Sequence, residues 1–345
     1  MATWTAGAIA CQNSPSGPNA PPRSAARIVA DGTAEAPIVF TSSQPEGAAP
    51  EETRTTYGGT DAAHDCGTLR YVRIEFAGFA LDADKEINAL TLAACGADTT
   101  VDFVQLHRGK DDGIEIFGGT VNLKHILVTL PMDDGLDWDF GWVGKLQFAI
   151  VQQSPVNGNQ GIEADNNNND NDAEPRSNPE IWNLTLVGSD AEPGTAIETQ
   201  KAMHLRRGTA GRIANALVMH FTDAAADVDG ASTVAQAEAG ALSVRSSIFF
   251  DNANAVRWPA ETEDNDAGFD EETYFGGAGL ANRFMDPMID DPMDPMAPSF
   301  KPTVGSPAMS NAATPPSDGF FDRAAHVGAI GTIDWTLGWT SYPRD

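Results

Sequence analysis

The chain has 345 residues, of which 49 are Asp or Glu and 21 are Lys or Arg, so its formal net charge at pH 7 is −28. A surface this acidic repels nucleic acid and anionic lipid, which argues against both as partners. The 33 glycines, the 41% of hydrophobic residues and the lack of long helix-forming blocks indicate many short strands joined by turns.

Residues 1–27 are predicted to be an N-terminal linker or an incomplete cap. Residues 6–11, Ala-Gly-Ala-Ile-Ala-Cys, faintly resemble a lipoprotein cleavage site, but no basic segment precedes them, so a targeting segment is not evident. No run in the chain approaches the ~18 apolar residues of a transmembrane segment.

Residues 28–250 carry a loose repeat of strand-like apolar runs. The long runs are 38–40, 69–76, 101–106, 121–128, 146–151, 181–187, 213–218 and 242–250. Shorter runs lie between them, at 87–92, 114–117, 136–140, 162–164 and 203–206. From Val101 to Val121 is 20 residues and from Val121 to Leu146 is 25, spacings that are typical of the coils of a solenoid.

This repeat predicts an all-β fold: a single-stranded right-handed parallel β-helix, the pectin-lyase-like solenoid, with long polar loops. No amphipathic helix of 10–15 residues separates the runs, which disfavours a doubly wound α/β sheet. An antiparallel sandwich is the structural alternative. The parallel β-helix is preferred because similar sequence recurs at the length of a coil, in residues 110–118, 132–141 and, in degenerate form, 159–165.

Residues 251–345 differ in composition from this repeat and are predicted to form an irregular loop and a C-terminal cap. Residues 251–300 are rich in Asp, Met and Pro and are expected to wrap around the last coils. The aromatic residues near the C-terminus, among them Trp335 and Trp339, should dock as a cap, because an open solenoid end exposes unpaired edge groups.

Cys66 and Cys95 are 29 residues apart, and each is followed by glycine. If one coil takes roughly 20–30 residues, the two cysteines could lie on neighbouring coils and form a disulfide. The alternative is a pair of small buried thiols, and the geometry decides between the two. Cys11 would then be left over.

Several motifs resemble a family of bacterial secreted or lipid-anchored β-helix proteins of myxobacterial and Bacteroidetes-like cell envelopes. The motifs are Tyr57-Gly58-Gly59-Thr60-Asp61, residues 66–74, residues 86–92, Asp111-Asp112-Gly113-Ile114-Glu115 with residues 116–122, Asp133-Asp134-Gly135-Leu136-Asp137, and the ending Asp334-Trp335-Thr336. The resemblance covers most of residues 28–250 and the last twenty. It implies a β-helix in a secreted or cell-surface protein and implies no reaction. Members usually carry extra N-terminal coils, so the fold of residues 1–55 stays open.

Acidic residues recur at equivalent positions of the repeat. They are Asp111, Asp112, Asp133 and Asp134 before two equivalent strands, and Glu115, Asp137 and Glu163 two residues after each glycine. Equivalent positions on adjacent coils lie ~4.8 Å apart, where carboxylates repel unless they are neutralised. Three outcomes are open: these seven residues bind Ca²⁺, one carboxyl keeps a proton for acid–base chemistry on a sugar, or the side chains bond turn amides.

A catalytic site is the enzymatic alternative, by analogy with pectin-degrading β-helices. Its residues would be Asp112, Asp134, Glu115 and Asp137, with His107 as the basic partner closest in sequence. His204, Arg206 and Arg207 are expected two or three coils away, ~10–14 Å along the axis.

Trp138, Phe140 and Trp142 alternate along one strand and are predicted to share a face. If this face is outward, Trp138 and Trp142 are carbohydrate-binding residues that stack on sugar rings. If it is inward, which is the preferred interpretation because solenoid cores need large side chains, the three aromatic residues fill the core.

No Walker A loop, GxSxG elbow, HExxH motif or dinucleotide-binding glycine fingerprint is present, so no nucleotide partner is expected. The function predicted from the sequence is that of an extracellular or cell-envelope β-helix protein. Its role would be non-enzymatic binding or scaffolding, with polysaccharide or cell-surface components as partners and Ca²⁺ as a stabilising ion. The alternative is a polysaccharide lyase or glycoside hydrolase.

Overall fold

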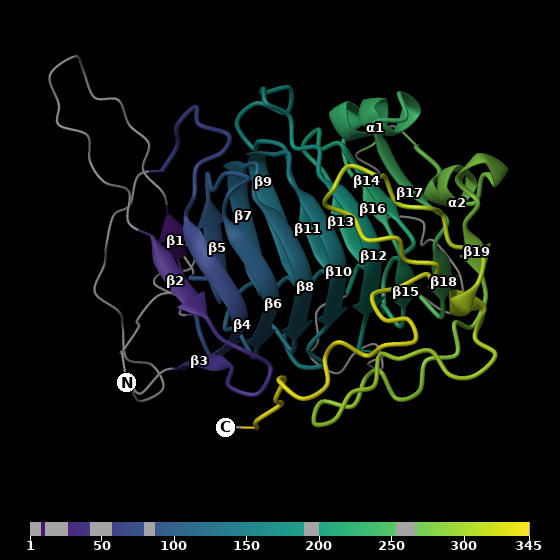
Figure 1. The fold of residues 1–345 in the computed structure, drawn as a ribbon. Coiled ribbons are helices and arrows are strands. Elements are labelled where there is room, and N and C mark those ends of the chain that lie inside the picture. Colours follow the sequence, from purple (N-terminus) through teal and green to yellow (C-terminus); the bar gives the residue numbers. More distant parts are fainter. Residues whose placement is uncertain are drawn as a thin grey trace, which may run out of the picture.

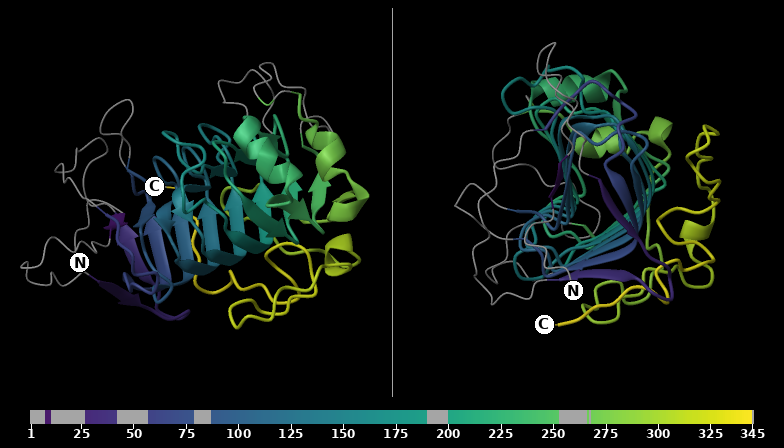
Figure 2. Two further views of the ribbon diagram at one scale, coloured as in Figure 1. Left: turned by 90° about the horizontal axis from the view of Figure 1, so that it is seen from above. Right: turned by 60° about the vertical axis from the view of Figure 1, so that its left-hand side comes forward.

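The computed structural model describes residues 8–10, 27–41, 57–78, 87–189, 200–252, 266 and 268–344. They form a right-handed parallel β-helix, an elongated stack of coils (Figure 1). Every pairing between its named strands is parallel, so the antiparallel sandwich is excluded. Figure 2 shows successive coils lying one behind another around a common interior.

Each coil contributes strands to two sheets. The seven-stranded sheet consists of β1 (Ala8–Ala10), β5 (Leu90–Ala93), β7 (Ile114–Gly119), β9 (Leu136–Trp142), β11 (Ile162–Ala164), β13 (Met203–Leu205) and β16 (Asp227–Val228). The twelve-stranded sheet consists of β2 (Ile28–Asp31), β3 (Ile38–Thr41), β4 (Gly67–Glu75), β6 (Thr100–His107), β8 (Asn122–Thr129), β10 (Lys145–Gln152), β12 (Glu180–Val187), β14 (Gly211–Ala214), β15 (Leu217–Met219), β17 (Leu242–Arg245), β18 (Ile248–Phe250) and β19 (Arg283–Phe284).

The long strands of the twelve-stranded sheet bend at one residue each. Tyr71, Phe103, His125 and Phe148 take up this position with φ of 48°, 55°, 49° and 61°, in the left-handed region that is uncommon for residues other than glycine. Their rings stack from coil to coil, with centroids 4.5 Å apart for Tyr71 and Phe103 and 4.1 Å for Phe103 and His125. The bend gives every coil a corner, so that β4 pairs with β2 before it and with β3 after it.

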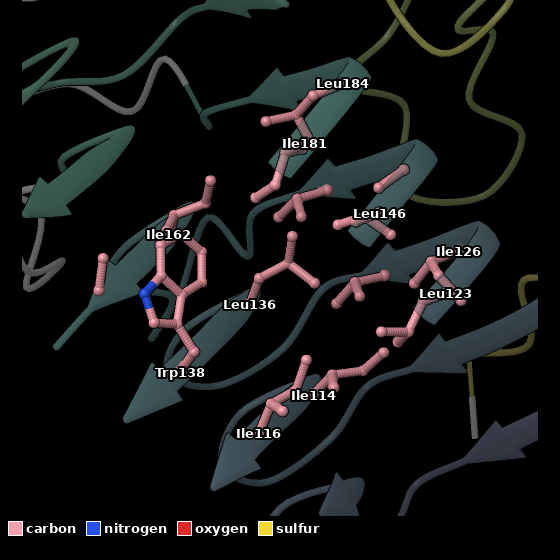
Figure 3. Close-up of a cluster of buried hydrophobic side chains, with 14 of the residues drawn as sticks. Ile114, Ile116, Leu123, Ile126, Leu136, Trp138, Leu146, Ile162, Ile181 and Leu184 are labelled. Atoms are coloured by element: carbon pink, nitrogen blue, oxygen red, sulfur yellow. The ribbon is translucent and has the colours of Figure 1, made fainter. Parts of the chain in front are cut away.

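The core lies inside the coils and is built by strand alternation. On β7, Ile114 and Ile116 are buried and Glu115 between them points outward. Ile114 stacks on Leu136, and Leu136 on Ile162, so each layer of the core continues the one before it (Figure 3). Full burial of one such aliphatic side chain contributes about 1.5–3 kcal/mol.

The predicted strand runs recur in the structure in the expected order. Val101 pairs with Leu123, and Val121, the first residue of the predicted run 121–128, lies in the turn before β8 begins. The short helices α1 (Ala231–Glu238) and α2 (Glu271–Phe275) and the 3₁₀ turns η1 (Ala278–Leu280) and η2 (Pro307–Met309) were not predicted. In the described part of the chain, no helix is long and apolar enough to cross a bilayer.

The last part of the chain, residues 285–344, is here called the C-terminal strap. It runs along the outer side of the twelve-stranded sheet toward the N-terminal coils (Figure 2), not over the open end of the solenoid as predicted. Side-chain amides on the sheet hold its backbone: Gln105 Nε2 donates to the carbonyl of Ser341 (2.7 Å) and Asn183 Nδ2 to that of His326 (2.8 Å). The strap covers this sheet because outward apolar and amide side chains there need partners.

Cys66 and Cys95 form a disulfide, with Cα atoms 5.7 Å apart. Cys11 lies outside the described residues, as does most of the predicted linker, residues 1–27. Within that segment, Ala8–Ala10 form β1 and pair with β5, so part of the predicted linker is a strand of the seven-stranded sheet.

Candidate functional site

Four successive turns are joined by three hydrogen bonds, each between a side chain of one coil and the backbone of the next. The amide of Asp134 donates to Oδ1 of Asp112 (3.0 Å), the amide of Gln160 to Oδ1 of Asp134 (2.5 Å), and the amide of Lys201 to Oε1 of Gln160 (3.0 Å). One oxygen of Asp112 and one of Asp134 therefore cap turn amides, and Gln160 continues this pattern in the degenerate third copy of the repeat.

A column of ionisable side chains runs along the outward face of the seven-stranded sheet. The register pairs Glu115 with Asp137, Asp137 with Glu163, Glu163 with His204, and His204 with Asp227. The predicted stacking of Glu115, Asp137 and Glu163 is confirmed. His204 is two coils from Asp137, as expected, and directly follows Glu163, so the acidic column ends in a histidine and a further aspartate.

Burial disfavours the ionised form of the carboxyl groups at the start of this column. It raises the pKa of Glu115 to about 8, with further contributions from neighbouring carboxylates, while a hydrogen bond from Asn88 acts in the opposite direction. Burial, together with the charges of nearby Asp and Glu side chains, also holds the pKa values of Asp112 and Asp137 well above their usual range. Without a cation, these carboxyls keep protons at pH values where exposed ones have lost them.

Two sets of carboxylates in the described chain are close enough to share an ion. One is Asp112, Glu115 and Asp137, and the other is Asp111, Asp112 and Asp133; within each set, one oxygen per residue lies within 4.8 Å of the others. Ca²⁺–oxygen bonds are about 2.3–2.6 Å long, so two ligands of one ion are at most ~5 Å apart. In the first set, Oδ1 of Asp137 is buried and has no hydrogen-bond partner among the described residues.

Asp134 and Glu163, which were also predicted as calcium ligands, belong to neither set. Asp134 is 4% exposed, and its Oδ1 accepts a hydrogen bond from the turn amide of Gln160. Glu163 forms an ion pair with Arg206, whose Nε also donates to Oδ1 of Asp165 (2.8 Å). Arginine side chains thus neutralise the column at this coil, and Asp134 and Glu163 lie outside both sets of carboxylates.

His107 does not face the acidic column, which corrects its assignment as the basic partner of a catalytic site. It ends β6 on the other sheet, is fully buried beneath the C-terminal strap, and lies 2.7 Å from Oγ1 of Thr129 and 2.9 Å from the carbonyl oxygen of Pro343. Burial lowers its pKa to about 4. Its place follows from strand alternation in β6, which points it away from the core and under a segment more than 200 residues later in the chain.

Trp138 and Trp142 are each 1% exposed and point into the core, so they cannot stack on sugar rings as predicted. Their indole N–H groups donate to Oγ1 of Thr209 (3.1 Å) and to the carbonyl of Val121 (3.0 Å). The three aromatics do not share a face, because Phe140 and Gly141 have φ of 54° and 83° and shift the register of β9 against β7. The two tryptophans therefore stay inside while Phe140 turns outward.

Phe140 joins two other rings beside the carboxylates. Tyr57 stacks on Phe117 with centroids 5.7 Å apart, and Phe117 lies 5.8 Å from Phe140. Tyr57 and Phe140 are 42% and 36% exposed, and burial with the charges of Asp139 and Glu115 raises the pKa of the Tyr57 phenol. No sequence pattern indicates this aromatic row, because Tyr57 comes from a distant loop and the outward turn of Phe140 depends on its left-handed backbone.

The sequence of this β-helix matches a known protein family. A family model for the pectate-lyase-like beta-helix domain matches residues 43–286, more than two thirds of the chain. No curated protein and no solved structure matches it. The matched segment includes the strands that carry the acidic column and most of the twelve-stranded sheet. The chain therefore belongs to the family of pectate-lyase-like β-helix domains.

Proposed function

We propose that this protein is a non-enzymatic, polysaccharide-binding β-helix of the bacterial cell surface or exterior, and that it holds Ca²⁺ on its acidic column. The observation that carries the proposal is the cluster of Asp112, Glu115 and Asp137, in which the buried Oδ1 of Asp137 has no hydrogen-bond partner within the described ranges. The family supports a role in polysaccharide recognition through its pectate-lyase-like fold.

Calcium suits this cluster for two reasons. It takes six to eight oxygen ligands, and carboxylates together with backbone carbonyls are the groups that this turn region presents. A divalent ion also replaces the protons that the raised pKa values of Asp112, Glu115 and Asp137 would otherwise retain. The ion would be held by one oxygen each of Asp112, Glu115 and Asp137, while Oδ1 of Asp112 continues to cap the turn.

A bound Ca²⁺ would in turn attract anionic sugars to a surface that otherwise repels them. Uronate carboxylates are hard oxygen ligands that can complete the coordination of such an ion. The exposed rings of Tyr57 and Phe140 lie beside Glu115 and Asp139, where a sugar ring can stack while its hydroxyls bond the carboxylates. We therefore expect an acidic polysaccharide to be the preferred partner.

Location outside the cytoplasm is part of the proposal. The Cys66–Cys95 disulfide is typical of proteins that fold in oxidising compartments. The motifs shared with secreted and lipid-anchored bacterial β-helix proteins point in the same direction.

The test is calcium binding by the full chain after treatment with EDTA. Isothermal titration should show saturable Ca²⁺ binding, and the midpoint of thermal unfolding should rise with Ca²⁺, by an amount that corresponds to about 2.7 kcal/mol at 100 times Kd. Asp137→Asn should abolish both effects, and Asp290→Asn, which changes an exposed residue of the C-terminal strap, should leave them intact. An unchanged midpoint in the wild type would refute the calcium site.

The polysaccharide partner is tested separately, by retention of the protein on immobilised polygalacturonate and on a neutral glucan. Retention should be stronger on the acidic polymer, should need Ca²⁺, and should weaken in Phe140→Ser. If neither polymer retains the protein at any Ca²⁺ concentration, polysaccharide binding is refuted even where calcium binding holds.

A polysaccharide lyase or glycoside hydrolase is the second candidate function. The pKa of about 8 at Glu115 favours it, because this carboxyl could donate a proton at neutral pH. Arg206, the cationic side chain at the next part of the column, is occupied by Glu163 and Asp165, which makes it a poor base. Release of reducing or unsaturated ends from acidic polysaccharides, lost in Glu115→Gln, would favour this alternative over simple binding.

A further inference from the structure

At the far end of the column, the side chains that could ligate a metal ion are a histidine and two aspartates, not carboxylates alone. His204 lies on β13, Asp227 pairs with it on β16, and Asp229 follows β16 directly. Nε2 of His204 is 2.6 Å from Oδ2 of Asp229 and 3.9 Å from Oδ2 of Asp227, and one donor atom from each residue lies within 4.8 Å of the others.

Two atoms of this group that could ligate a metal ion are buried and have no hydrogen-bond partner in the part of the chain that the structure describes. They are Oδ1 of Asp227, a residue that is only 3% exposed, and Nδ1 of His204. A buried carboxylate oxygen without a donor is unfavourable, and such an oxygen next to an imidazole is a natural metal ligand.

Glu163 occupies the position expected of an outer carboxylate. Its Oε1 is 3.8 Å from Nδ1 of His204, whereas the two aspartates lie near Nε2. Histidines that ligate metals usually donate their other ring N–H to a carboxylate, which fixes the tautomer and the orientation of the ring. With a metal ion bound, an Nδ1–H directed toward Glu163 would leave Nε2 unprotonated toward the ion; without the ion, Nε2 is hydrogen-bonded to Oδ2 of Asp229.

Lys201 is the competitor for this position, because its ammonium group forms an ion pair with Oδ2 of Asp227. It does not balance the local charge. Asp223 and Glu271 also interact electrostatically with Asp227, so that carboxylates outnumber Lys201 at this end of the sheet. The lysine bonds one oxygen of Asp227 and leaves Oδ1 for a second cation.

We propose that His204, Asp227 and Asp229 form a binding site for a divalent transition-metal ion, with Zn²⁺ as the best representative and Glu163 as the positioning residue of His204. Imidazole nitrogen together with two carboxylates favours zinc and its neighbours over Ca²⁺, which prefers oxygen ligands only. The ion would join β13 to β16, the last strand of the seven-stranded sheet. This site shares no residue with the Asp112, Glu115 and Asp137 cluster and does not depend on it.

The experiment is titration of the EDTA-treated full chain with ZnCl₂, followed by calorimetry and by the absorption spectrum of the Co²⁺-substituted protein. One zinc ion per chain should bind at this site. His204→Ala and Asp229→Asn should each weaken it by at least ~10- to 100-fold, the loss that changes to outer-sphere groups alone produce. Lys201→Met should strengthen zinc binding, since the competing ammonium group is gone.

His220→Ala is the matched control, because His220 also faces an aspartate, Asp251 at 3.3 Å, but belongs to none of the metal-sized clusters among the described residues. It should bind zinc like the wild type. Zinc binding that survives both His204→Ala and Asp229→Asn, or that is lost in Asp137→Asn, would overturn the proposal, as would the absence of stoichiometric binding. Because Asp137→Asn removes only the calcium response, failure of the zinc site and failure of the calcium site give different patterns.

Discussion

Glu115→Gln isolates the electrostatic cost of the acidic column. The amide has nearly the shape of the carboxylate and can still accept the hydrogen bond from Asn88, so the packing around β7 should be kept. With a pKa of about 8 in the folded protein and an ordinary value of 4.5, Glu115 keeps its proton on folding while the unfolded chain loses it. The stability from this group is therefore present below pH 4.5 and is lost as the pH rises toward 8.

The size of this effect follows from the two pKa values. Between pH 4.5 and pH 7, each pH unit changes the free energy of unfolding by about 1.4 kcal/mol, which amounts to about 3 kcal/mol at pH 7. In EDTA, Glu115→Gln should therefore be more stable than the wild type at pH 7 by up to this amount, and the two proteins should converge near pH 4.5. In saturating Ca²⁺ the order should reverse, because the variant lacks a ligand.

Urea unfolding of both proteins across this pH range, with EDTA and with Ca²⁺, measures the difference. Glu35→Gln, at an exposed turn position, is the control and should follow the wild type at every pH. Other groups that titrate in the same range, His107 among them, are common to all three proteins and cancel in the comparison. Parallel pH profiles for wild type and Glu115→Gln would refute both the raised pKa and the argument for a cation.

Three further predictions concern the fold. In Gly113→Ala, the new Cβ would lie 2.3 Å from Cγ1 of Val128 and 2.6 Å from the carbonyl oxygen of Gly135, so urea unfolding should show a loss of about 1–3 kcal/mol, whereas Gly279→Ala, with no atom within 4 Å, should be near neutral. As the pH falls from 6.5 to 4, the wild type should lose up to about 3 kcal/mol of its free energy of unfolding, because the pKa of His107 is lowered in the folded protein and the unfolded chain binds the proton first. His107→Gln should lack this loss, and identical acid profiles of the two proteins would contradict the prediction. Replacing Cys66 and Cys95 by serine opens a loop of 29 residues and should lower the free energy of unfolding by about 3–4 kcal/mol, and an unchanged urea midpoint would argue against the pairing.

The fold could be predicted from the sequence because its determinants are local and repeated. Alternating apolar runs define the strands, and the recurrence of Asp-Asp-Gly at coil length defines the stacking of Glu115 on Asp137. Every coil repeats the same pairing, so one well-placed motif fixes the register of its neighbours.

The parts that could not be predicted depend on contacts distant in sequence or on single backbone angles. The C-terminal strap contacts Gln105 from a position 236 residues later, and no local pattern encodes that pairing. The outward turn of Phe140 depends on its positive φ, which simple alternation does not predict, whereas the preferred inward position of Trp138 and Trp142 is confirmed. Only an explicit search for partners of the outward amides on β6 and β12 could have indicated that this sheet is covered.

The way in which charge is neutralised along the column is the strongest reason to expect ions at both of its ends. At the coil of β11, Glu163 and Asp165 are satisfied by Arg206 and Arg207, so protein side chains already supply the cations. At the coils of β7 and β9, no ion pair in the described ranges involves Asp112, Glu115 or Asp137, and burial raises the pKa values of their carboxyls instead.

At β16, Lys201 engages only one oxygen of Asp227. The same sheet thus accommodates carboxylates in register in three different ways: by raised pKa values at β7 and β9, by arginine at β11, and in part by lysine at β16. A buried carboxylate without a charge partner is unfavourable, and a bound cation would supply that partner. The coils without an arginine partner are the ones where an external cation can bind. The set of ligands at β7 and β9 consists of oxygen atoms only, which calcium prefers, whereas the set at β13 and β16 includes a histidine nitrogen, which zinc prefers.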